Sequence, residues 1–173
     1  MIIDDILAIR ERWHTKNHPF FRAFAEGKLP LRAMGVYKAM HWKFVQHGLA
    51  SFGILYARTI AHEDVRKAIA ENISEEEGFK ALNTEVVLPA FARHYGFPAG
   101  SPEIEFFTEH AEADLEHSRR QATLCAKYLD SDAAKARALE VAEQACLLRW
   151  ASITDLYRRE YLGEKEILPS GVD

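Results

Sequence analysis

The sequence predicts a single all-α domain. Apolar residues recur every three or four positions along most of the chain, and no segment alternates apolar and polar residues as a half-buried strand does. Turn-forming residues divide the chain into about six or seven helical stretches. With 173 residues, the chain can bury a core without disulfides or a structural metal. We therefore expect one domain over residues 1–173.

Three helices are predicted in the N-terminal third. The first covers about residues 3–14, where apolar residues have helical spacing. The second begins near His18-Pro19, because proline fits the first position of a helix, and ends at Gly27. The third runs from about Pro30 to Ala61. Its inward pattern is Tyr37, Met40, His41, Phe44, Val45, Phe52, Leu55 and Tyr56.

Two helices are predicted in the middle of the chain. One starts at His62 and reaches the acidic run that ends at Gly78. Within that run Glu76 follows Ile73 by three positions and so continues the apolar face. The other extends from Thr84 to Tyr95, with Pro89 as a possible kink.

Two helices complete the expected fold. Ser101 is expected to cap a helix that has Pro102 at its first position and continues to about Leu129. A break at residues 130–132 then caps the last helix, over about residues 133–161. Its expected core face contains Leu139, Ala142, Cys146, Trp150, Ile153 and Tyr157.

Charge and composition argue against several classes of partner. The net charge is −4 with both signs interspersed, so neither a nucleic-acid surface nor a membrane patch is expected. The N-terminal residues do not resemble a secretory signal, and no apolar run approaches the roughly 18 residues of a membrane span. Cys125 and Cys146 lack CxxC spacing, so we expect free thiols and a cytoplasmic protein.

One helical stretch concentrates metal-binding residue types. His110, Asp114 and His117 fall in one narrow sector of a helix, and Phe106 and Leu124 make that sector apolar. Burying two imidazoles and a carboxylate is costly unless something compensates. A divalent metal would use all three as ligands. The alternatives are hydrogen bonds to neighbouring carboxylates without a metal, or an exposed polar stripe.

Three further residues are candidates for substrate binding. Gln46 and His47 are polar residues within the long third helix, and a pocket-lining role competes with an ordinary core or surface position. Arg120 follows His117 closely and could meet a substrate carboxylate, although a solvated arginine is the alternative.

Most of the chain resembles the heme-oxygenase-like diiron oxidases, whose superfamily includes thiaminase II and the pyrroloquinoline quinone synthase C protein. Residues 110–117 match the family's His-x3-Asp-x2-His helix. Residues 18–29 resemble its N-terminal signature, and residues 66–76 resemble the helix that carries its first glutamate ligand. The resemblance is closest to the para-aminobenzoate synthase group and implies a heme-oxygenase-like bundle that forms a homodimer.

The resemblance also implies a metal centre. Its ligands would be Glu76, Glu85, His110, Asp114 and His117, holding one or two Fe(II) ions, with manganese as a possible substitute. Dioxygen and a small organic molecule would be the substrates.

The sequence departs from the family's pattern at several points. Only 33 residues separate Glu76 from His110, so the centre is shorter than usual by about two helices. Asn83 or Thr84 stands where the family has a further histidine, and Glu77 is an alternative to Glu85 as the second glutamate. Phe21 replaces the tyrosine of the para-aminobenzoate synthases, which argues against that self-sacrificing reaction.

These residues predict a non-haem iron oxidase, with a diiron centre favoured over a single ion. It would use dioxygen to oxidise a small molecule such as an amino acid, amine or carboxylate. Two alternatives remain. One is a metal-free enzyme like the quinone synthase or thiaminase II, and the other is a non-catalytic helical binding or scaffold protein.

Overall fold

The computed structural model describes residues 2–75, 82–109, 123–124 and 126–165. Within these ranges the chain is helical and has no β-strand, which confirms the all-α prediction. The α-helices are α1 (Ile2–Arg12), α2 (Pro19–Ala25), α3 (Leu31–Arg58), α4 (Glu63–Glu75), α6 (Leu88–His94), α7 (Glu105–Glu109) and α9 (Asp132–Glu160). Shorter helical turns are η1 (Thr15–Asn17), η2 (Asn83–Val87) and η3 (Pro102–Ile104).

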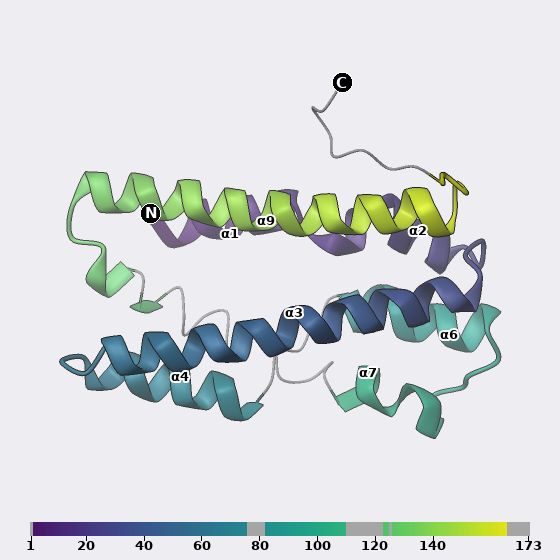
Figure 1. Ribbon diagram of the computed structural model, residues 1–173, viewed down its shortest axis with the longest axis horizontal. Helices are drawn as coiled ribbons and strands as arrows, with labels where there is room; N and C mark the ends of the chain where they lie inside the picture. Colours follow the sequence, from purple (N-terminus) through teal and green to yellow (C-terminus); the bar gives the residue numbers. More distant parts are fainter. Residues whose placement is uncertain (1, 76–81, 110–122, 125, 166–173) are drawn as a thin grey trace.

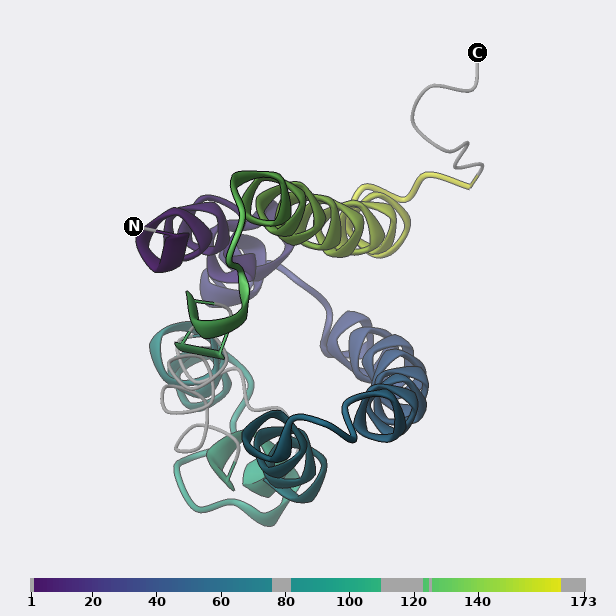
Figure 2. The same ribbon diagram turned by 90° about the vertical axis from the view of Figure 1, so that its left-hand side faces the viewer.

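Two long helices, α3 and α9, extend along the longest dimension of the molecule (Figure 1). Helix α1 packs against α9, and α4 folds back along α3. Seen end-on in Figure 2, the helices form a ring in which α9 lies between α1 and α3. None of the helices described is both long and apolar enough to cross a bilayer.

Helix α2 is the centre of the core. Phe20, Phe21 and Phe24 are fully buried. The ring of Phe24 stacks on Tyr95 at a centroid distance of 4.6 Å and meets Phe91 edge-on at 5.1 Å. These aromatic pairs add to the free energy gained by burying the rings, so this short helix holds the N-terminal and central segments together.

The ends of α2 are set by local sequence. Pro19 occupies the first turn, as predicted. At the other end Gly27 has φ +69°, its N–H donates to Phe24, and the N–H of Lys28 donates to Ala23. This pattern satisfies the last carbonyls of the helix and requires a left-handed residue, for which glycine is best suited.

His18 caps α2 and links it to α9. Its Nδ1 accepts the N–H of Phe20 at 3.1 Å, and its Nε2 lies 3.0 Å from Oγ1 of Thr154. The Thr154 hydroxyl donates to the carbonyl of Trp150 at 3.0 Å. The neutral imidazole with its proton on Nε2 satisfies every group in this network. Burial lowers the pKa of His18 to about 4, so the ring is neutral at physiological pH.

Helix α9 completes the core from the C-terminal side. Ser131 caps it by accepting the N–H of Ala134 at 3.2 Å, which confirms the predicted break. Ile153 and Leu156 are buried in the core. In the N-terminal half of α9, Glu143 accepts hydrogen bonds from Arg12 and from the indole of Trp13 at the end of α1.

The segment before α6 is a π-helix. The N–H of Leu88 donates to the carbonyl of Asn83, five residues earlier, instead of to residue 84. Pro89 has no N–H and its ring crowds the carbonyl four residues before it, so a wider turn at this point relieves the helix. The predicted helix over residues 84–95 is therefore present, and the distortion at Pro89 takes the form of a π turn.

Two expectations from sequence are corrected. Ser101 does not cap the following turn through its side chain, because its hydroxyl donates to the carbonyl of Pro98 at 2.7 Å. The apolar pattern of α3 is buried only in part. Tyr37 and His41 are buried, whereas the exposed side chains on this helix include Met40, Phe44, Leu55 and Tyr56. The spacing of apolar residues predicts which face of a helix is apolar, but that face is buried only where other elements cover it.

Candidate functional site

Most of the predicted metal ligands lie outside the described residues. Glu76, His110, Asp114 and His117 belong to this group, and so does the alternative ligand Glu77. Arg120, the candidate for a substrate carboxylate, lies outside them as well. Their roles stay predictions. Among the described residues, no group of three or more His, Cys, Asp or Glu side chains is placed to hold a metal ion.

Glu85 is the one predicted ligand that the structure describes. It belongs to η2, and its exposed carboxylate lies 3.3 Å from Nζ of Lys16 in η1. Lys16 also lies 3.6 Å from Glu11 of α1. In this arrangement the Glu85 carboxylate links η2 to the N-terminal helices through one of its two oxygens.

Gln46 and His47 are exposed on α3. The backbone carbonyl of His47 accepts a hydrogen bond from Ser51 at 3.0 Å, which is a local contact within the helix. Neither residue is among those found to line the cavity described next.

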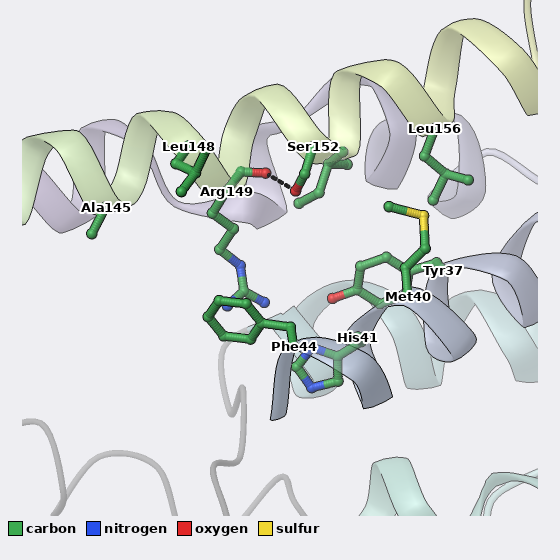
Figure 3. A pocket seen from close by; sticks show the side chains of 10 residues that line it. Tyr37, Met40, His41, Phe44, Ala145, Leu148, Arg149, Ser152 and Leu156 are labelled. Atoms are coloured by element: carbon green, nitrogen blue, oxygen red, sulfur yellow. Dashed lines mark hydrogen bonds between the residues drawn. The ribbon is translucent and has the colours of Figure 1, made fainter. Parts of the chain in front are cut away.

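A cavity of about 280 Å³ lies between α3 and α9 (Figure 3). Its innermost wall is formed by the buried side chains of Tyr37, Ile153 and Leu156. Phe44 and Leu148 stand at its rim, with exposed fractions of 56% and 73%. The remaining described lining residues are Met40, His41, Ala145, Arg149 and Ser152.

Arg149 brings the only formal charge among the described residues that line this cavity. Its side chain reaches from α9 toward α3, and its guanidinium lies 6.0 Å from the centroid of the Phe44 ring (Figure 3). This cation–π geometry holds the guanidinium near the apolar wall. The His41 ring stacks with Tyr37 at 5.9 Å and with Phe44 at 6.5 Å, which orders this side of the cavity.

A half-buried amine lies on a different part of α3. Nζ of Lys38 is 4.5 Å from the centroid of Phe107 in α7. Burial lowers the pKa of Lys38 to about 7, because the ammonium form loses hydration that a folded chain replaces incompletely. Lys38 therefore gives up its proton more readily than an exposed lysine does.

One residue in the sequence, Arg149, could have indicated the cavity. Arg149 lies three positions after Cys146 and four before Ile153, so it falls on the predicted core face of the last helix. A charged residue on an apolar face is a candidate for ligand binding. The partner surface on α3 could not be identified in the same way, because the crossing of the two helices depends on tertiary packing.

Comparison with known proteins gives no further guide, because no family model, curated protein or solved structure matches this chain.

Proposed function

We propose that this chain is a non-haem iron oxidase that uses dioxygen to oxidise a small organic molecule. The observation that supports this most directly is the spacing of His110, Asp114 and His117, which in a helix would put two imidazoles and a carboxylate on one face. The resemblance to the heme-oxygenase-like diiron oxidases and the helical architecture agree with the proposal.

The chemistry of the donor set fits Fe(II). Imidazole nitrogen and carboxylate oxygen are ligands suited to iron and manganese, and Glu76 with Glu85 or Glu77 would complete the set. When bound, Fe(II) supplies the electrons with which dioxygen is activated. The chain's own residues would position the metal, and the apolar walls around a bound substrate would exclude water from it.

Metal analysis tests this proposal. The full chain should be reconstituted with Fe(II) under anaerobic conditions, desalted, and analysed for iron by mass spectrometry. We expect one or two iron ions per chain, a near-complete loss in His117→Ala, and no loss in His94→Ala, a control that removes an exposed histidine of α6. Circular dichroism checks that each variant is folded. Iron at background level in the folded wild-type chain would overturn the proposal.

Single substitutions of the glutamates identify the remaining ligands. Glu76→Ala should reduce bound iron, and either Glu85→Ala or Glu77→Ala should do so as well, depending on which is the second carboxylate. Lys16→Ala provides a control for Glu85, because it removes the ion pair but leaves the carboxylate in place. If Glu85→Ala and Glu77→Ala both keep the full iron content, neither glutamate is a required ligand.

A binding or scaffold function is the second candidate, because α3 has a substantial exposed apolar surface. Trp42, Phe44, Ile54 and Leu55 are each more than two-fifths exposed. Exposed apolar side chains of this size commonly mark a contact with another protein or with a second copy of the chain. Light scattering would show a homodimer if a second copy covers this surface. A folded chain that binds no iron and forms a stable assembly would favour this function over the oxidase.

A further inference from the structure

The cavity between α3 and α9 has one charged group set into a mainly apolar lining. The walls come from Tyr37, Ile153 and Leu156 on the inside and from Phe44 and Leu148 at the rim. None of the described lining residues is acidic. A ligand for this cavity therefore needs an apolar body, and a negative charge if it is to match the guanidinium of Arg149.

The guanidinium is suited to a carboxylate. It presents a planar array of five N–H donors, which can serve more than one acceptor at a time. It lies 6.0 Å from the centroid of the Phe44 ring, at the edge of the cavity. The Ser152 hydroxyl donates to the Arg149 carbonyl at 2.7 Å and is thus already engaged within α9. Arginine and carboxylate form paired, charge-assisted hydrogen bonds, and partial desolvation strengthens them.

The volume limits the size of the ligand. An apolar cavity of about 150 Å³ holds benzene, so 280 Å³ has room for one ring with a short side chain or for a medium-length alkyl chain. A helix from another protein has a diameter of about 10–12 Å with its side chains, which is too large for a hollow of this volume. The cavity therefore favours a small molecule over a protein segment.

We propose that this cavity binds a small organic acid, with its carboxylate on Arg149 and its hydrocarbon part against Tyr37, Ile153 and Leu156. The suggestion that such an acid is the substrate of an oxidase rests on the function proposed above. Binding of the acid in the cavity does not depend on iron, because none of the described lining residues belongs to the predicted metal ligands.

Calorimetric titration of the full chain, purified without added metal, tests the site. The probes are 3-phenylpropanoate and octanoate, which distinguish an aromatic from an aliphatic acid, together with the neutral 3-phenylpropanamide. We expect at least one acid to bind, and 3-phenylpropanoate to bind about tenfold more tightly than its amide, since a charged hydrogen bond contributes about that factor. Equal affinity of acid and amide, or no binding of either acid at millimolar concentration, would overturn the proposal.

Three variants locate the bound acid. Arg149→Met should weaken binding of the acid about tenfold and leave the amide unchanged, because it removes the charge and keeps an apolar chain of similar length. Ala145→Phe should weaken both probes by filling the cavity from α9. Arg137→Met is the matched control, because Arg137 is an exposed arginine of α9 that pairs with Glu140. Unchanged acid binding in folded Arg149→Met would refute the assignment.

The outcomes separate this site from the proposed metal centre. Selective acid binding without any iron in the reconstituted chain would leave the cavity assignment intact and remove the oxidase. Bound iron without acid binding would support the metal centre and reject this site.

Discussion

Acidification should destabilise the fold through His18, by an amount that can be worked out from its surroundings. The imidazole is 1% exposed, and its Nδ1 accepts the N–H of Phe20. A proton added to Nδ1 removes this acceptor and places a charge in the core. In the unfolded chain the pKa of a histidine is about 6.5, whereas burial lowers the pKa of His18 to about 4 in the folded chain.

The two pKa values of His18 determine whether the free energy of unfolding rises or falls with pH. Between about pH 6.5 and pH 4 the unfolded chain binds a proton that folded His18 does not, so the free energy of unfolding decreases as the pH falls. Above about pH 6.5 the contribution of His18 is constant, and below about pH 4 no more is lost. The interval of about 2.5 pH units corresponds to roughly 3 kcal/mol, at about 1.4 kcal/mol per unit.

Urea denaturation at pH 7.5, 6, 5 and 4.5 measures this loss in the wild type and in His18→Asn. Asparagine can still cap α2 by accepting the Phe20 N–H, but it does not titrate. The pH-dependent loss of the wild type should therefore exceed that of the variant by about 2–3 kcal/mol over this range.

Taking the difference between the two proteins removes the contribution of every other group, including His14, whose pKa burial also lowers. His47→Asn, which replaces an exposed histidine of α3, should follow the wild-type profile. Parallel profiles for the wild type and His18→Asn would refute the reasoning.

Three further predictions concern the core, Lys38 and the end of α2. Phe24→Ala should lower the free energy of unfolding by about 3–5 kcal/mol in urea denaturation, because it leaves a large cavity, whereas Leu148→Ala at an exposed position should change it by less than about 1 kcal/mol. Lys38 should titrate near pH 7 when its amine is dimethylated and observed by carbon NMR, with Lys38→Arg used to assign its signal. A titration midpoint near pH 10 would contradict the effect of burial. Gly27→Ala should cost about 1–3 kcal/mol in urea denaturation, because φ is +69° and the new Cβ would lie 2.7 Å from Cγ of His94. Adding His94→Gly, which also removes the His94 Cβ at 2.9 Å, should restore less stability to Gly27→Ala than the clash alone would account for, and an unchanged free energy of unfolding in Gly27→Ala would contradict both costs.

Helix starts and ends were the part of the fold most open to prediction from sequence. His18-Pro19, Gly27 and Ser131 act through local chemistry, since each contacts backbone groups only a few residues away. The π turn before Pro89 was beyond this approach, because apolar spacing does not distinguish one wide turn from a regular helix. Local signals therefore predicted where helices occur more reliably than their internal geometry.

Burial and the cavity depended on tertiary contacts that periodicity does not contain. Phe44 and Tyr37 belong to one apolar pattern of α3, yet Tyr37 is buried and Phe44 is largely exposed. Arg149 was recognisable as a charge on an apolar face, but its neighbour Phe44 on α3 was not. The metal centre stays a prediction from the spacing of His110, Asp114 and His117, which lie outside the described residues.

The pairing of α1 with α9 has a consequence for synthesis on the ribosome. Arg12 and Trp13 meet their partner Glu143 across about 130 residues of intervening chain. At roughly 5–20 residues per second, the end of the N-terminal helix is synthesised about 7–26 s before that partner is. Throughout this interval the aromatic side chains of α2 lack the surface that α9 later provides, so the nascent chain is exposed to aggregation or to capture by chaperones until translation reaches the last helix.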